Sequence, residues 1–158
     1  VIGTPATVRS AAYPRLIRRL RPEVRVISRA CPLFVPLAEE GWMNDGAGAR
    51  EVVRRVAELY LDELRRHRVD TLILGCTHYP LLREAIGAVM GPEVALVDAS
   101  GETAREAQAV LERRGARRSS SPVRGRRRFF VTDDPGRFRR VAERFLGSAL
   151  GEVRLARL

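Results

Sequence analysis

A thiol, a hydroxyl and an imidazole stand on three successive residues, Cys76, Thr77 and His78. They follow an apolar run at residues 71–74, Thr-Leu-Ile-Leu, and a glycine and a proline bracket them. This pattern predicts a strand-to-helix turn, which is where parallel sheets place their chemistry. A thiol becomes a base when its pKa falls from about 8.5 toward neutrality, and an imidazole and a helix N-terminus both act in that direction. The alternative is that Cys76 is a buried, inert side chain.

The other cysteine and the other histidine carry weaker signals. Cys31 is followed by a proline and a nearly all-apolar stretch, which predicts a buried thiol. His67 ends an arginine-rich helical pattern and is interpreted as a cation at a helix C-terminus. The cysteine and histidine spacings match no zinc pattern, and no Gly-x-Gly-x-x-Gly follows a predicted strand. We therefore expect no metal and no nicotinamide cofactor.

Strand and helix signals alternate through most of the chain, which predicts a parallel sheet with helices on its faces. The first helix is expected to turn Leu16 and Leu20 toward the core, and Ser100 or Thr103 is expected to cap the last helix before the arginine-rich segment. Strands are expected at residues 1–3, 24–27, 71–75, 94–97, 128–132 and 153–155. Helices are expected at residues 7–20, 49–67, 81–90, 100–114 and 135–147, with a loop at 41–48.

The net charge of +10 is concentrated in one segment. Residues 113–128 hold eight arginines and no acid, with glycine, serine and proline but no apolar periodicity. We expect a flexible Arg-rich linker there, between an α/β domain at residues 1–112 and a C-terminal tail at 129–158. All 29 basic residues are arginine and no aromatic side chain interleaves with the basic run, so nucleic acid is not expected as a partner.

Composition excludes several classes of protein. A chain of 158 residues with 45% hydrophobic and 30% charged residues can form a globular core. No apolar run approaches the roughly 20 residues of a membrane span, and no signal-peptide pattern opens the chain. Two cysteines do not make a disulfide framework, so we expect a cytoplasmic protein. The sequence leaves open whether the chain forms a homo-oligomer.

Four segments resemble glutamate racemases in order and rough spacing. The most specific is Gly-Cys-Thr-His-Tyr-Pro-Leu-Leu at residues 75–82, because related aspartate racemases usually carry an acid where His78 stands. The resemblance implies a doubly wound parallel sheet of the aspartate/glutamate racemase type with a C-terminal strand-helix-strand tail. The other three segments are Val-Ile-Gly-Thr-Pro-Ala-Thr-Val-Arg-Ser at 1–10, Ala-Cys-Pro-Leu-Phe-Val-Pro-Leu at 30–37 with Glu-Glu-Gly at 39–41, and Phe-Phe-Val-Thr-Asp-Asp-Pro at 129–135.

The resemblance also implies an activity, the cofactor-independent interconversion of L- and D-glutamate by proton transfer between two thiols, which supplies D-glutamate for peptidoglycan. Cys76 would be the thiol that deprotonates L-glutamate, and His78 would support it. Glu39 or Glu40 would hold His78 in orientation.

Three threonines would line the glutamate pocket, and these are Thr4, Thr7 and Thr77. The alternative for Thr4 and Thr7 is a plain helix N-cap, because threonine is common at that position.

The second thiol of this mechanism is missing from the chain. In the family, the first half of the protein supplies an Asp-Ser pair and a Cys-Asn-Thr motif, and neither occurs in these 158 residues. The chain also opens on Val1 within a predicted strand. We therefore expect the C-terminal part of a longer protein, inactive or nearly so by itself, whose tail packs on the absent domain.

Two other functions stay open. The chain could be a noncatalytic binding module whose basic segment contacts nucleic acid or DNA gyrase, which some family members are described as inhibiting. Phosphate binding through that segment would weaken steeply as ionic strength rises. It could also be a related racemase or an arylmalonate decarboxylase-like enzyme, although His78 argues against the aspartate branch.

Overall fold

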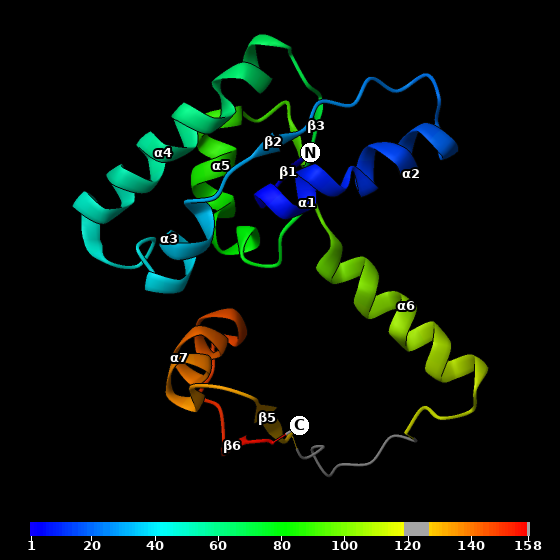
Figure 1. The fold of residues 1–158 in the computed structure, drawn as a ribbon, viewed down its shortest axis with the longest axis vertical. Helices are drawn as coiled ribbons and strands as arrows, with labels where there is room; N and C mark the ends of the chain where they lie inside the picture. The colour runs from blue at the N-terminus through cyan, green and yellow to red at the C-terminus, as the bar shows by residue number, and fades with distance from the viewer. Residues whose placement is uncertain (119–126, 158) are drawn as a thin grey trace. The chain divides into compact units, whose positions relative to one another are not determined.

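The computed structural model describes residues 1–118 and 127–157, which belong to two compact units, Val1–Glu106 and Ala107–Leu158 (Figure 1). The first unit contains a parallel sheet of four strands in the order β2-β1-β3-β4. The strands are β1 (Ile2–Gly3), β2 (Arg29–Ala30), β3 (Thr71–Leu74) and β4 (Ala95–Asp98).

The order of the strands creates a switch point between β1 and β3. From β1 the chain moves to β2 on one side, and it then crosses to β3 and β4 on the other side. The connections that follow β1 and β3 therefore diverge, and open α/β sheets bind their ligands in the crevice that such a divergence leaves. Thr4 directly follows β1 and Cys76 lies two residues after β3, so both lie at this point of the sheet.

Helices cover both faces of the sheet, as predicted for a doubly wound fold, with α1 and α2 on one face and α4 and α5 on the other (Figure 1). The buried side chains of α4 recur at helical spacing, at Val53, Ala57, Leu61 and Leu64, and pack in the core with Ile2, Phe34, Leu72 and Tyr79. The helices are α1 (Pro5–Ser10), α2 (Ala12–Leu20), α3 (Phe34–Glu40), α4 (Gly46–Arg66), the 3₁₀ helix η1 (Tyr79–Leu82), α5 (Arg83–Met90) and α6 (Ala99–Arg113).

The prediction of one continuous helix over residues 7–20 was wrong. The helix is interrupted at Ala11, whose φ of 50° is left-handed, and α2 starts again at Ala12. Pro14 explains the position of the break, because the proline ring would clash with the carbonyl of residue 10 in a continuous helix. Leu16 and Leu20 were expected in the core but are 45% and 66% exposed.

The predicted strand at residues 24–27 was also wrong. In this part of the chain the residues that pair with β1 are Arg29 and Ala30, opposite Ile2 and Gly3. The residues before them form no ladder, although the Ile27 carbonyl accepts a hydrogen bond of 2.7 Å from the Val1 amino group. The β-branched side chains favour extended backbone, but a strand also needs a partner in register.

The observed bounds of several elements differ from the predicted ones. The loop predicted at 41–48 is shorter, because α4 begins at Gly46, and the helix predicted at 81–90 begins with η1. Ser100 and Thr103 lie inside α6 rather than before it, and the Asp98 carboxylate accepts the Ser100 backbone N–H at 3.0 Å. The stabilising acceptor at this helix start is therefore Asp98.

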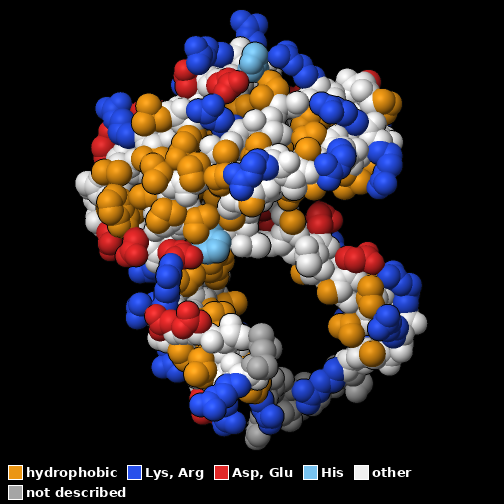
Figure 2. All heavy atoms as spheres, viewed as in Figure 1, with side chains coloured by type: hydrophobic (Ala, Val, Ile, Leu, Met, Phe, Trp, Pro, Cys, Tyr) orange, Lys and Arg blue, Asp and Glu red, His pale blue; other side chains and the backbone are white. Residues whose placement is uncertain are grey.

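Exposed apolar side chains remain on the first unit. Val52 and Leu59 of α4 are 43% and 77% exposed, and Leu33 before α3 is 52% exposed. Figure 2 shows hydrophobic side chains gathered over the region of α3, α4 and α5. None of the described helices is both long and apolar enough to cross a membrane.

The second unit confirms the predicted strand-helix-strand tail. β5 (Phe129–Val131) pairs in parallel with β6 (Val153–Leu155), and α7 (Pro135–Leu146) connects them. The Asp134 side chain caps α7 by accepting the Arg137 backbone N–H at 2.9 Å. Of the linker predicted at 113–128, residues 119–126 lie outside the described residues, and the three-part division of the chain stays a prediction.

Candidate active site

Cys76, Thr77 and His78 lie in the turn between β3 and η1, as the sequence predicted. The turn begins at Gly75, whose N–H donates a 2.8 Å hydrogen bond to the Ile2 carbonyl of β1. A Cβ atom at residue 75 would lie 2.7 Å from that same oxygen, so only glycine allows this approach. The turn is closed by a hydrogen bond of 3.2 Å from the Tyr79 N–H to the Cys76 carbonyl.

A chain of polar contacts runs from Cys76 through His78 to Glu39. The Cys76 Sγ lies 3.9 Å from His78 Nδ1, and His78 Nε2 lies 3.2 Å from Glu39 Oε1. The side chains of His78 and Glu39 are 24% and 20% exposed, so the pair is mostly shielded from water. Glu39 is on α3 and its neighbour Glu40 is exposed. The structure therefore brings Glu39, rather than Glu40, to the imidazole.

Glu39 determines which ring nitrogen of His78 is the acceptor. An ionised carboxylate only accepts hydrogen bonds, so a neutral His78 carries its proton on Nε2 and presents a lone pair at Nδ1. That lone pair faces the Cys76 thiol. The arrangement can therefore move a proton from sulfur to the ring, and Glu39 stabilises the imidazolium that forms.

Thr77 also reaches the imidazole. Its hydroxyl Oγ1 lies 3.4 Å from His78 Nδ1, and the residue is exposed at the surface of the turn.

Thr4 and Thr7 lie at the end of the neighbouring strand β1. Thr4 is the N-cap of α1, and its Oγ1 accepts the Thr7 N–H at 3.2 Å. The two hydroxyl oxygens are 3.0 Å apart. The N-cap that the sequence allowed is thus present at Thr4. Because β1 and β3 are adjacent parallel strands, both hydroxyls lie with Cys76 at the carboxyl ends of the strands.

Cys31 is fully buried, as predicted. Burial raises the pKa of the Cys31 thiol to about 12. This thiol stays protonated at neutral pH and is sealed from solvent, so it cannot act as an acid or base on a substrate.

Tyr79 is a residue of the site that sequence reasoning assigned no role. Its buried hydroxyl donates a hydrogen bond of 2.9 Å to the Cys31 carbonyl, just before α3. Burial raises the pKa of this hydroxyl far above its usual value, so it remains a donor. The sequence offered one signal for this role, an aromatic side chain directly after Cys76, Thr77 and His78.

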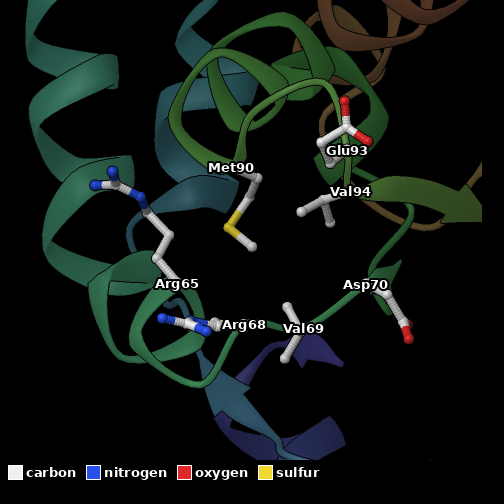
Figure 3. A pocket seen from close by; sticks show the side chains of 7 residues that line it. All are labelled: Arg65, Arg68, Val69, Asp70, Met90, Glu93 and Val94. Carbon is white, nitrogen blue, oxygen red and sulfur yellow. The ribbon is translucent and has the colours of Figure 1, made fainter.

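No group of three or more His, Cys, Asp or Glu side chains that could hold a metal is found among the described residues. A hollow of about 350 Å³ lies at the other end of the sheet, where Asp70 precedes β3 and Val94 precedes β4. Figure 3 shows Arg65, Arg68 and Met90 around it. This hollow is separate from the Cys76 turn, which lies at the carboxyl ends of the strands.

Comparisons with known proteins find that the chain is similar to glutamate racemases. It is 52% identical over 153 residues to the glutamate racemase of Geobacter metallireducens, covering 97% of this chain and 54% of that protein. It is 45% identical over 158 residues to the glutamate racemase of Syntrophus aciditrophicus, covering 100% of this chain and 56% of that protein. The chain thus spans little more than half the length of these relatives. No protein-family model matches it.

Solved structures of glutamate racemases are also similar to the chain in fold. A glutamate racemase isoform from Bacillus anthracis superimposes with a TM-score of 0.84 at 32% identity, covering 99% of this chain and 56% of that one. The Francisella tularensis glutamate racemase, solved in complex with D-glutamate, has a TM-score of 0.83 at 34% identity with the same coverage.

Proposed function

We propose that this chain, which belongs to the glutamate racemase family, supplies one half of the catalytic site of an enzyme that interconverts L- and D-glutamate. The observation that carries the proposal is the line of contacts from Cys76 through His78 to Glu39 at the switch point of the sheet. It supplies a thiol beside a proton acceptor at the carboxyl ends of the strands, which is where open α/β sheets bind their ligands.

Racemisation requires a base on one face of the α-carbon and an acid on the other. In the direction from L- to D-glutamate, the Cys76 thiolate takes the α-proton, and the electron pair of the C–H bond stays on the substrate as a carbanion. A second group on the opposite face then donates a proton to that carbon. His78 holds the proton that Cys76 must lose before each such turnover, and Glu39 stabilises the charged ring.

The second acid/base group lies outside these 158 residues. The chain has two cysteines, and Cys31 is excluded because it is buried and protonated. The chain also spans only 54% of the Geobacter relative. We propose that the remaining part of the enzyme carries the second thiol, so the isolated chain does not turn over glutamate.

Thr4, Thr7 and Thr77 are proposed to bind the charged ends of glutamate. Hydroxyl groups and helix N-terminal N–H groups both donate to carboxylates, and Thr4 and Thr7 stand at the start of α1. In this proposal the chemistry needs no cofactor, and the enzyme works in the cytoplasm, where D-glutamate feeds peptidoglycan synthesis. The Francisella tularensis protein was solved with D-glutamate, which supports glutamate as the ligand.

The tail is proposed to pack against the remaining part of the enzyme. Its exposed apolar side chains include Phe130 and Leu155, each 58% exposed, and Phe138, which is 37% exposed. Apolar surface of this kind favours a protein partner. The other candidate function, a basic module that binds nucleic acid, is not favoured, because the relatives are named glutamate racemases.

A chimera tests the proposed function. The chain replaces the segment that it matches in the Geobacter metallireducens glutamate racemase, and D-glutamate formation from L-glutamate is measured by chiral chromatography. We expect turnover by the chimera, no turnover by the chain alone, and loss of turnover on Cys76→Ser. Cys31→Ala is the matched control and should retain activity. A folded chimera without turnover, or one that stays active after Cys76→Ser, would contradict the proposal.

A further inference from the structure

Two donors meet at one nitrogen of His78. The Thr77 hydroxyl oxygen lies 3.4 Å from Nδ1, and the Cys76 sulfur lies 3.9 Å from the same atom. Since Nε2 faces the Glu39 carboxylate at 3.2 Å, a neutral ring has a single lone pair for both donors. We propose that Thr77 is a positioning residue that competes with Cys76 for this lone pair and keeps the thiol protonated until a ligand draws the hydroxyl away.

The distances show that neither donor has displaced the other. Hydrogen bonds from a hydroxyl to nitrogen or oxygen are usually shorter than 3.4 Å, and the sulfur contact of 3.9 Å is also long. Both contacts are therefore weak and easily exchanged. A threonine hydroxyl hydrogen rotates to suit its best acceptor, and Thr77 is exposed at the sheet edge where a ligand arrives.

The competition has two states. While the Thr77 hydroxyl donates to Nδ1, the ring is neutral and the thiol keeps its proton. When an anionic ligand such as a carboxylate accepts the Thr77 hydroxyl, Nδ1 becomes available to Cys76. The S–H bond then breaks, the electron pair stays on sulfur, and the proton forms an N–H bond at Nδ1. The imidazolium that results donates to Glu39 on its other side.

This exchange would couple thiolate formation to ligand binding. Thiolates react with oxidants and alkylating agents far faster than thiols do, so an empty site benefits from a protonated sulfur. The inference deepens the proposed function and rests on it, because the thiolate is the base that racemisation requires. Its test nevertheless uses no turnover, so its outcome can be distinguished from that of the chimera.

The test measures the alkylation rate of Cys76 at neutral pH in the 158-residue chain. Iodoacetamide is the reagent, and mass spectrometry of the labelled peptide separates Cys76 from Cys31. Thr77→Val removes the hydroxyl at nearly constant shape, and we expect alkylation to become about fivefold faster, the equivalent of about 1 kcal/mol for one net hydrogen bond. Thr77→Ser keeps the hydroxyl, and its rate should stay within about twofold of the wild type.

His78→Gln provides the decisive background. The glutamine side chain has no basic nitrogen that could take the thiol proton, so adding Thr77→Val should not change the rate further. An unchanged or slower rate in Thr77→Val overturns the inference, and so does an equal acceleration in the His78→Gln background, which would indicate improved access alone. If circular dichroism shows that Thr77→Val folds poorly, Thr77→Ala replaces it. The same alkylation rates would then support or overturn the inference.

Discussion

The buried hydroxyl of Tyr79 donates a hydrogen bond of 2.9 Å to the backbone carbonyl of Cys31, which lies 48 residues earlier in the chain. This bond joins the turn that carries Cys76 and His78 to the segment that leads into α3, where Glu39 lies. The Phe34 ring meets the Tyr79 ring edge-to-face, with centroids 5.2 Å apart. The contact between His78 and Glu39 thus depends on a buried polar bond and an aromatic pair beside it.

Tyr79→Phe should lower the free energy of unfolding by about 1 to 3 kcal/mol, because the buried Cys31 carbonyl loses its donor. Urea denaturation followed by circular dichroism measures the change. Tyr60→Phe is the matched control, since Tyr60 also meets Phe34 edge-to-face, but its hydroxyl accepts from Leu33 near the surface at 3.3 Å. We expect Tyr60→Phe to cost less. Equal costs would show that the Tyr79 hydroxyl has no special role.

Stability should fall in alkali because of Cys31. Burial raises the pKa of its thiol to about 12. The unfolded chain ionises the same thiol from about pH 8.5 upward. Unfolding then releases a proton, so the contribution of Cys31 to stability is complete below about pH 8.5 and is lost as the pH rises toward 12.

The measurement compares the chain with its Cys31→Ala variant, both carrying Cys76→Ser, by urea denaturation at about pH 7.5 and about pH 10. From the linkage relation, the parent should lose about 1 to 2 kcal/mol more than Cys31→Ala between these two values. Parallel losses in the two proteins would mean that Cys31 is accessible to ionisation in the folded state.

Gly75→Ala should destabilise the fold by about 1 to 3 kcal/mol, because the new methyl group would press on the Ile2 carbonyl at 2.7 Å. A backbone atom cannot move aside without disturbing the pairing of β1 with β3. Gly48→Ala is the control, since Gly48 lies in α4 with nothing within 4 Å of the added atom. It should be neutral or stabilising by up to about 1 kcal/mol. Thermal unfolding of both variants measures the change in stability. A Gly75→Ala variant as stable as the parent would contradict the close contact between residue 75 and the Ile2 carbonyl.

Glu39→Gln should slow racemisation by the chimera at least about tenfold, because the neutral amide no longer stabilises the charged His78 ring. Glu40→Gln alters the adjacent, exposed carboxylate and should leave the rate within about twofold. Initial rates of D-glutamate formation from saturating L-glutamate give the comparison. A greater loss in Glu40→Gln would reverse the assignment of the two glutamates.

Local chemistry in the sequence was enough to predict much of the fold. The apolar run before Gly75 predicted β3 and the turn that carries Cys76 and His78, and the prediction for β6 matches its observed bounds. The tail was confirmed as a strand, a helix and a strand. Each of these depends on neighbours within a few residues, such as a glycine, a proline or an alternating apolar pattern.

Tertiary structure decided what depends on distant parts of the chain. The sequence left Glu39 and Glu40 equivalent, and the packing of α3 beside η1 brought Glu39 to His78. Residues 24–27 had strand-like side chains, but the register with β1 placed the ladder at Arg29 and Ala30. The apolar spacing of α2 indicated a buried face, yet Leu16 and Leu20 remain exposed. A pattern along the chain reports what a segment favours locally, whereas pairing and burial depend on which surface the fold brings against it.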